Sequence, residues 1–304
     1  MTHSSPSTSD TRLRGAVAIV LGAGIWGLFW IPLRYLENYG FEGLWAVAAT
    51  LSIPLILSMP FIWKRLASGF DRHFVLLGLI IGFSVVFYFG GVLFSDVVRV
   101  IFLFYMLPIW TTLLGRIFNK EEISPRKLIA IAIALLGLYL LLGGGSGWPV
   151  PSNIGDFFGL ASGFLWASSL VFLRYHSTMN PILATSAPFV FGAPIAIAAA
   201  LLMMSVAPEY GPPLPPIESI FPGLLFGGFF GLVVLAPSVY GQVWGARLIA
   251  SSTAALLTMV ELITATVSAF LLIGTSLNST SMIGGLIIAG AAVLDLTAPE
   301  TRAD

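Results

Sequence analysis

The sequence contains no cysteine, which excludes disulfide bonds, iron–sulfur clusters and cysteine-ligated zinc. Its three histidines, His3, His73 and His176, all lie outside the long apolar runs, so a buried histidine metal site is not expected. The chain also lacks a phosphate-binding glycine loop, an HExxH motif and a credible catalytic triad. The sequence therefore predicts a protein without catalytic residues, metal or cofactor.

Charged residues are also scarce in this sequence. Charged residues make up 9% of the 304 residues and hydrophobic residues 57%, whereas soluble domains carry about 25% charged residues. A water-soluble chain of this length could not bury so much apolar surface in one or two cores. Because the formal net charge is zero, nothing indicates a nucleic-acid partner. The composition indicates a protein whose solvent is the lipid bilayer.

Ten apolar runs are separated by charged or turn-forming residues. A helix needs about 20 apolar residues to cross a hydrocarbon core of about 30 Å. The run after Arg14 could be a cleaved signal peptide, but it lacks a small-residue cleavage site, so we expect it to be retained. The first six spans are bounded by the pairs Arg14/Arg34, Glu42/Lys64, His73/Asp96, Arg99/Arg116 (approximately), Lys127/Gly143 and Asp156/Arg174. The last four lie at about 182–206, 217–240, 250–273 and 281–297.

The distribution of basic residues predicts the orientation. Lysine and arginine collect on the cytoplasmic side of membrane proteins. If the amino terminus is cytoplasmic, the outside segments hold only Arg34 and Arg99, and the other 12 of the 14 basic residues are inside. We therefore predict a multi-pass protein of a cell inner membrane with both termini cytoplasmic.

The chain contains two related halves. The stretch 25–35, IWGLFWIPLRY, aligns with 165–175, LWASSLVFLRY, at an offset of 140 and matches Trp26 to Trp166. A second pair, 107–121 and 261–275, aligns more weakly at an offset of 154. We predict a cytoplasmic polar tail at 1–14, a first five-helix repeat at 15–143, a linker at 144–154, a second repeat at 155–297 and a cytoplasmic tail at 298–304.

A repeat with an odd number of spans must enter the membrane inverted in its second copy. The predicted fold class is therefore an all-α polytopic membrane protein, with ten transmembrane helices forming two inverted five-helix repeats around a central cavity. Many secondary transporters follow this plan and bind their solute near the midplane. The alternative is that inverted duplication only builds a stable bundle.

The chain resembles the drug/metabolite transporter superfamily in its EamA-like ten-helix branch. The resemblance rests on the IWG at 25–27, on LPIWTTLLGRIFNKEEIS at 107–124 with Pro108, Gly115 and Glu121, and on the second copy of that block. The second copy departs from the pattern, with Leu262 in place of the usual proline and Thr275 in place of the closing acid.

Within this superfamily the chain is most similar to aromatic amino-acid exporters of the YddG type. The resemblance implies that helices 1, 3, 4, 6, 8 and 9 line the cavity while helices 5 and 10 pack behind them. It also implies outward movement of amino acids and related small metabolites by alternating access.

Glu261 is an acid deep inside the predicted ninth span. Ionisable groups in this environment are costly and commonly functional. Glu261 is thus a candidate for proton or cation coupling, or for the counter-charge of a substrate ammonium group. The alternative is a protonated or hydrogen-bonded carboxyl that joins two helices.

Aromatic side chains form the predicted substrate-binding set. They suit an amino-acid side chain by stacking and a substrate ammonium group by cation–π attraction of about 0.5–2 kcal/mol. Packing against lipid, or an interfacial belt, is the alternative. The set consists of Trp26, Tyr88, Tyr105, Trp110, Trp166 and Tyr240.

Pro108 and Pro237 lie inside the predicted fourth and eighth spans. Proline removes a backbone hydrogen bond within a helix, so both residues are candidates for bends that serve gating.

The predicted function is a secondary transporter that exports aromatic and other neutral amino acids, with proton coupling possible. The main alternative is a transporter of drugs or of another metabolite. An intramembrane enzyme or a helical scaffold remains as a different class of protein.

Overall fold

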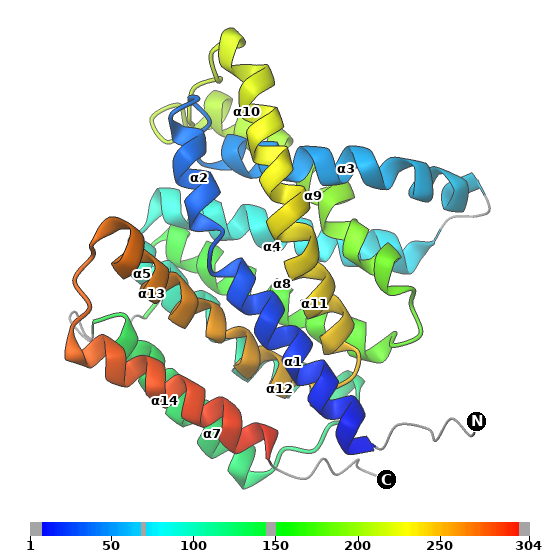
Figure 1. Cartoon of the computed structure of the whole chain (residues 1–304), viewed down its shortest axis with the longest axis vertical. Helices are drawn as coiled ribbons and strands as arrows, with labels where there is room; N and C mark the ends of the chain where they lie inside the picture. The colour runs from blue at the N-terminus through cyan, green and yellow to red at the C-terminus, as the bar shows by residue number, and fades with distance from the viewer. Residues whose placement is uncertain (1–7, 68–70, 144–149, 298–304) are drawn as a thin grey trace.

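The computed structural model describes residues 8–67, 71–143 and 150–297, and the regular secondary structure in these ranges is helical. Figure 1 shows the helices crossing one another as a bundle, in which α1 begins and α14 ends at the same end of the molecule. We call this the terminus end. Arg12 on α1 donates a hydrogen bond of 3.3 Å from Nη2 to the carbonyl of Asp295 on α14, which joins the first and last helices there.

The helices of the described residues form ten segments in the predicted order. Four of them consist of shorter helical pieces. The segments are α1–α2 (Thr8–Trp26, Trp30–Glu37), α3 (Leu44–Ala67), α4 (Arg72–Phe94), α5–α6 (Val97–Phe104, Leu107–Phe118), α7 (Pro125–Leu141), α8 (Ile154–Tyr175), α9 (Pro181–Val206), α10–η1–α11 (Ile217–Phe230, Gly231–Leu235, Ala236–Ala246), α12–α13 (Ser251–Thr258, Val260–Ile273) and α14 (Ser279–Leu296).

The five junctions between such pieces fall in four of the segments, namely α1–α2, α5–α6, α10–η1–α11 and α12–α13. By length and composition, eight of the ten segments are apolar helices long enough to span a membrane. The other two are α3, whose apolar part is Leu44–Pro60, and α7, which has 17 residues.

Two boundaries differ from the sequence prediction by more than three residues. Helix α1 begins at Thr8, inside the stretch that the sequence assigns to the polar tail, and α11 continues to Ala246, beyond the predicted end at Tyr240. In both cases the helix runs past the apolar core, because polar residues at a membrane surface do not interrupt helical hydrogen bonding. Residues 1–7, 144–149 and 298–304 of the predicted tails and linker lie outside the described residues.

The packing of the helices repeats between the two halves. Helix α4 packs closely against α8, and α11 packs in the same way against α1. A Cβ on Gly155 would lie 2.6 Å from the carbonyl oxygen of Gly91, and one on Gly15 would lie 3.3 Å from that of Gly245. These two crossings are related by offsets of 140 and 154 residues. The halves therefore face each other across a pseudo-two-fold axis, and the odd number of spans in each half places that axis in the membrane plane.

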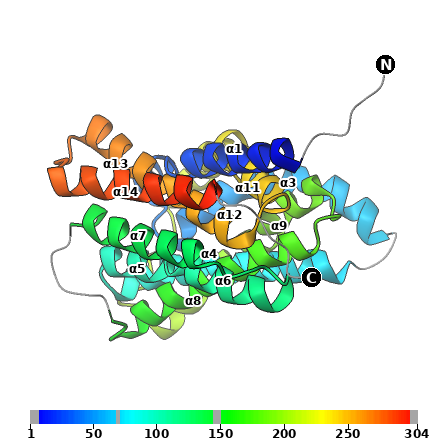
Figure 2. The ribbon, with the colours of Figure 1, turned by 90° about the horizontal axis from the view of Figure 1, so that it is seen from below.

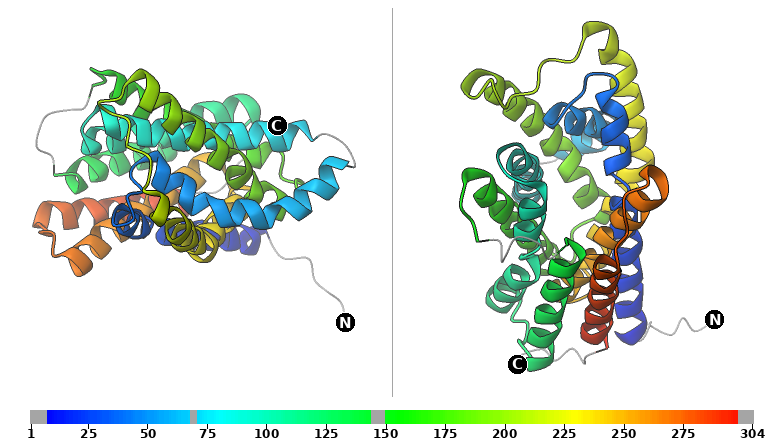
Figure 3. Two further views of the ribbon diagram at one scale, coloured as in Figure 1. Left: turned by 90° about the horizontal axis from the view of Figure 1, so that it is seen from above. Right: turned by 90° about the vertical axis from the view of Figure 1, so that its left-hand side faces the viewer.

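Helices α7 and α14 form a pair at one edge of the bundle, as Figure 2 and the right-hand view of Figure 3 show. Gly137 on α7 and Gly284 on α14 lie at their crossing, where an added Cβ would meet backbone atoms at 2.8 Å and 2.3 Å. Small residues at such a crossing let two helices approach closely. The pair is the last span of each half, so the edge is itself arranged about the pseudo-two-fold axis.

The break between α5 and α6 follows from Pro108. Proline has no N–H to donate to the carbonyl four residues earlier, and its ring clashes with that carbonyl. Helix α5 ends at Phe104, four residues before Pro108, and α6 begins at Leu107. The freed carbonyl of Phe104 lies against Gly163 of α8, where an added Cβ would be 2.3 Å from the oxygen. A glycine at 163 thus accommodates the break.

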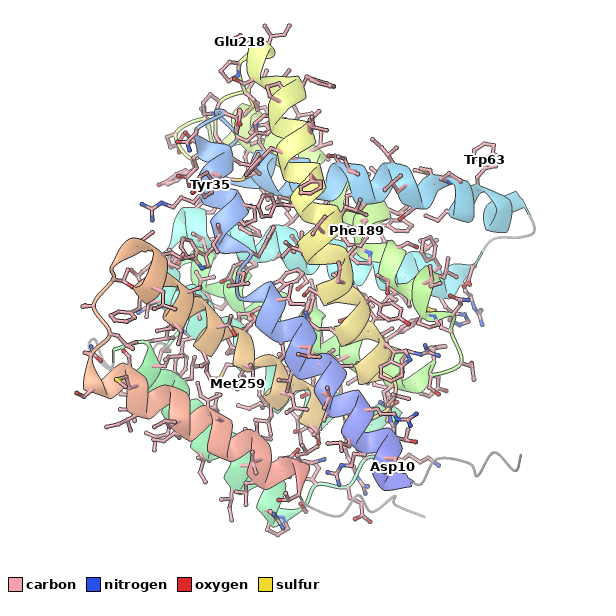
Figure 4. All side chains as sticks on the ribbon, in the orientation of Figure 1. Asp10, Tyr35, Trp63, Phe189, Glu218 and Met259 are labelled. Atoms are coloured by element: carbon pink, nitrogen blue, oxygen red, sulfur yellow. The ribbon has the colours of Figure 1, made fainter. Side chains whose placement is uncertain are left out.

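The equivalent break in the second half has no proline. Helix α12 ends at Thr258 and α13 begins at Val260, so the junction residue Met259 is 154 positions after Tyr105. Its backbone N–H donates to Leu256, three residues earlier, and the N–H of Leu262 donates to Met259 in the same tight pattern. Figure 4 shows Met259 where the two helices meet. The bend is retained although Leu262 replaces the usual proline.

A π-helical turn, η1, precedes Pro237. The N–H of Ala236 donates to the carbonyl of Gly231, five residues earlier, and this wider turn lets the chain pass a proline at the start of α11. Gly231 lies directly against α3, where an added Cβ would be 1.7 Å from the carbonyl oxygen of Thr50. The segment thus combines a local widening with a close helix contact.

Candidate transport cavity

A cavity of about 510 Å³ lies between the two halves. Its walls come from the α1–α2 junction, α2, α4, α5, α8 and α13. At its rim are Val97, the first residue of α5, and Leu141, the last residue of α7. Both residues lie at the end of the bundle opposite the termini, so the cavity extends from the middle of the bundle toward that end.

The cavity differs in two ways from the lining that the family resemblance implies. The eighth span, α10–η1–α11, contributes no residue to it, whereas Leu141 and Leu142 at the end of the fifth span do. The reason is the asymmetry of the conformation, because a cavity that extends to one end meets only the half of each helix that lies at that end.

Two tryptophans form the floor of the cavity. Trp26 at the end of α1 and Trp166 in the middle of α8 contact each other, with ring centroids 5.8 Å apart. The side chain of Trp166 is 9% exposed. These residues are equivalent in the two halves, and their contact places them beside the pseudo-two-fold axis.

Tyr88 on α4 and Tyr105 at the α5–α6 junction also line the cavity. Both rings pack against Phe104 in T-shaped contacts, with ring centroids 5.3 Å (Tyr88) and 5.0 Å (Tyr105) from that of Phe104. The aromatic set predicted from the sequence therefore has four members in the cavity, namely Trp26, Tyr88, Tyr105 and Trp166.

Glu261 lies in the first turn of α13 and lines the same cavity. Its carboxylate accepts a hydrogen bond from the hydroxyl of Tyr105. The backbone carbonyl of Glu261 abuts Gly27, where an added Cβ would lie 2.3 Å from the oxygen. The helix breaks at Met259 and Tyr105, together with Gly27 opposite, thus hold this carboxyl group beside the aromatic floor.

The rest of the lining is mainly apolar. Ser84 and Ser162 exchange hydrogen bonds between their hydroxyls and each other's backbone carbonyls, at 2.9 Å and 2.7 Å. Trp30 donates from Nε1 to Ser268 at 3.0 Å. Among the described residues that line the cavity, Glu261 is the one carboxylate and none is lysine, arginine or histidine.

Four other predicted site residues lie elsewhere. Trp110 on α6 packs edge-on against Phe164, with ring centroids 5.5 Å apart, and Tyr240 on α11 is 43% exposed. Neither lines the cavity. Pro237 follows η1 on the exposed side of α11, while Pro108 is buried at the α5–α6 junction.

At the terminus end, the two halves are joined by a polar cluster of Asn119, Glu121 and Ser251. Glu121 Oε1 accepts hydrogen bonds from the backbone N–H and the hydroxyl of Ser251, at 2.9 Å and 2.8 Å. Asn119 Nδ2 donates to Ser251 Oγ at 3.1 Å and to the carbonyl of Val171 on α8 at 3.2 Å. We call these three residues the latch. It ties the end of α6 to the start of α12, where the cavity is closed.

The opposite end carries an ion pair between a half-buried arginine and a buried aspartate. Arg99 Nη2 lies 2.5 Å from Asp156 Oδ2, and Asp156 also accepts from Ser95 Oγ at 2.5 Å and from the backbone N–H of Ser152 at 2.9 Å. This pair joins α5 to the start of α8, and so fixes one wall of the cavity at its rim.

A family model for EamA-like transporters matches the chain twice, over residues 13–143 and 153–297. The chain belongs to the EamA-like transporter family. As an EamA-like protein it is a polytopic membrane transporter of the drug/metabolite superfamily, built from repeated halves. The two matches account for the equivalence of Trp26 with Trp166 and of Tyr105 with Met259.

A comparison with solved structures finds 29 matching chains. One, titled only "Crystal structure of protein", has a TM-score of 0.68 and 17% sequence identity, and the alignment covers 95% of this chain and 98% of that one. At this identity the similarity shows the fold alone. A search of curated proteins finds no match.

Sequence reasoning missed several residues of the site. Phe29 and Trp30 are close to the aligned tryptophan and could have been found from the W-x3-W spacing in IWGLFW. Asn119 and Ser251 carried no such signal, because they are polar residues at helix ends, where capping is their ordinary role. Only the folded chain brings them together across the two halves.

Proposed function

We propose that this EamA-like transporter exports aromatic and other neutral amino acids, with related small metabolites, across an inner membrane by alternating access. The observation that carries the proposal is a mid-bundle cavity with an aromatic floor and a carboxylate beside it. Its volume of about 510 Å³ falls in the range of about 300–1,000 Å³ typical of small-molecule sites.

The chemistry of the cavity fits an amino acid in two respects. The aromatic rings provide stacking surface for an apolar or aromatic side chain. Glu261 and the ring faces suit an ammonium group through charge and cation–π attraction. The same carboxylate is our candidate for proton coupling, with Tyr105 and Tyr88 as the titratable neighbours that line the cavity with it.

The positive-inside distribution supports a cytoplasmic location for both termini. With that orientation the cavity faces the outside of the cell, and the latch closes the cytoplasmic end. Alternating access then requires the latch to open while α5 and α13 approach each other. Aromatic amino-acid exporters of the YddG type remain our proposed subgroup.

Loss of the latch is expected to favour the state that is open at the terminus end. Glu121→Ala removes two hydrogen bonds that join the halves, worth roughly 2 kcal/mol together, or roughly thirtyfold in the ratio of the two states. Because the chain has no cysteine, spin labels can be attached at Arg14→Cys on α1, which packs against α12, and at Lys120→Cys, which follows α6; both positions are exposed at the terminus end. We expect their distance distribution to shift to longer values.

The matched control for this measurement is Glu122→Ala, which removes the neighbouring carboxylate and leaves the latch in place. A distance distribution that Glu121→Ala leaves unchanged, or that Glu122→Ala shifts equally, contradicts a role for the latch.

The alternative function is transport of hydrophobic drugs or another metabolite, which the mainly apolar lining favours. Flux of labelled amino acids in proteoliposomes, with and without an imposed pH gradient, separates the two. We expect saturable flux of aromatic amino acids and competition by other neutral ones. If a folded preparation moves a hydrophobic cation but no amino acid, the drug transporter is the correct assignment.

A further inference from the structure

The pseudo-symmetry pairs each residue of the cavity with a counterpart on the terminus side of the tryptophan floor. In the first span the offset is 140, so that Trp26, Phe29, Trp30 and Leu33 pair with Trp166, Ser169, Leu170 and Leu173. On α4 the offset is 154, as the Gly91 and Gly245 crossings show, so that Val85, Tyr88 and Phe89 pair with Val239, Gln242 and Val243.

These counterparts surround a second, enclosed cavity of about 30 Å³. Its lining includes every counterpart named above, together with residues of α3 and α9 such as Leu51 and Phe189. Phe189 is labelled near the centre of the bundle in Figure 4. Trp26 and Trp166 line both cavities, so the tryptophan pair is the partition between them. We call the smaller one the inner cavity.

Two buried polar atoms at the inner cavity have no hydrogen-bond partner. They are Oε1 of Gln242, whose side chain is 4% exposed, and Nε1 of Trp166, which is 9% exposed. The amide of Gln242 is oriented by Ser238, which accepts from Gln242 Nε2 at 3.4 Å while donating its own proton to the carbonyl of Gly22. This arrangement leaves the amide oxygen of Gln242 free to accept.

An unpaired acceptor and an unpaired donor in an apolar enclosure are costly, by about 1–3 kcal/mol each. The present volume accommodates about one or two water molecules. A transported solute that carries both an N–H donor and a carboxylate would satisfy both atoms. The inner cavity contains no charged residue among the described residues that line it, whereas the larger cavity contains Glu261.

We propose that the inner cavity is the collapsed form of a second solute subsite, in which Gln242 and Trp166 bind the polar groups of a zwitterionic or neutral amide-like solute when the terminus end is open. The inference rests on the proposed transport function. It adds an uncharged subsite that binds the solute when the terminus end is open, as the Glu261 site does when the opposite end is open. In this subsite Gln242 occupies the position equivalent to Tyr88.

The first part of the test asks whether the inner cavity opens. Leu33→Cys and Leu173→Cys place single cysteines at equivalent positions of the two cavities. In reconstituted vesicles, a membrane-impermeant maleimide should label position 173 from the terminus side and position 33 from the opposite side. Leu138→Cys, a fully buried position on α7 away from both cavities, is the control and should remain unlabelled.

The second part tests Gln242 itself with labelled phenylalanine as the probe. Gln242→Leu keeps the volume of the side chain but removes the acceptor. We expect this substitution to raise KM for entry from the terminus side about tenfold or more. The phenylalanine concentration that protects position 33 from labelling on the opposite side should not change. Gln242→Asn, which keeps the amide, should restore part of the affinity, and protection at position 33 shows that each variant is folded.

The two hypotheses fail in different ways. If position 173 is labelled but no amino acid is transported, the proposed substrate is wrong and the subsite stands. If phenylalanine is transported while position 173 remains as unreactive as position 138, the inner cavity is not on the path. If Gln242→Leu raises KM equally from both sides, or from neither, Gln242 does not bind the solute.

Discussion

Glu261→Gln is expected to lower the apparent affinity for amino acids at the open cavity by roughly ten- to a hundredfold. The substitution keeps the shape of the side chain and removes its charge, and a hydrogen bond to a charged group contributes about 1.5–3 kcal/mol. Glu261 is the one carboxylate among the described residues of that cavity. Equilibrium binding of labelled phenylalanine in detergent, and flux in proteoliposomes, both measure the effect.

Tyr105→Phe is the companion variant for this prediction, because it removes the donor to Glu261 and leaves the carboxylate. Its effect on affinity should be smaller than that of Glu261→Gln. If coupling depends on Glu261, the stimulation of flux by a pH gradient is lost in Glu261→Gln and retained in Tyr105→Phe. Equal affinity of the wild type and Glu261→Gln would instead assign Glu261 a purely structural role between α5 and α13.

Gly231→Ala is expected to give the largest loss of stability of any alanine substitution at a glycine of the bundle. The added Cβ would lie 1.7 Å from the carbonyl oxygen of Thr50, which is backbone and cannot rotate away. Helices α3 and η1 must therefore separate, at a cost of about 3 kcal/mol by analogy with overpacked cores. Thermal unfolding of the purified protein in detergent measures the change.

Gly290→Ala on α14 is the matched control for Gly231→Ala. It lies within a helix on an exposed face, and no atom lies within 4 Å of the added Cβ. Alanine there should be neutral or stabilising by up to about 1 kcal/mol. If both variants unfold at the same temperature, the contact between Gly231 and Thr50 does not determine stability.

The sequence predicted the number and order of the spans because charge is excluded from the hydrocarbon core, and this constraint acts on each residue independently of its neighbours. It could not predict how each helix is rotated about its axis. Tyr240 was chosen for its aromatic ring, yet it lies on the exposed side of α11, and Gln242, two residues later, lies inside. Two residues on a helix differ by about 200°, so a correct span still leaves the inward face undetermined.

The helix breaks were partly predictable. Pro108 indicated the junction between α5 and α6, because proline interrupts backbone hydrogen bonding wherever it occurs within a helix. The junction at Met259 carried no such residue. It is retained by the packing of the second half against the first, with the backbone of Glu261 against Gly27, and contacts between segments more than 200 residues apart leave no local signal in the sequence.

The contact between Trp26 and Trp166 has a consequence for the history of the chain. A residue beside a two-fold axis meets its own copy, as at the isologous interface of a homodimer. In an ancestral five-helix subunit that paired with an inverted copy of itself, one codon would have specified both rings of the partition. Any mutation would then have altered both faces of the membrane at once. Two codons in one chain instead allow the two faces to differ, as the pairs Tyr88 with Gln242 and Glu261 with Leu107 show.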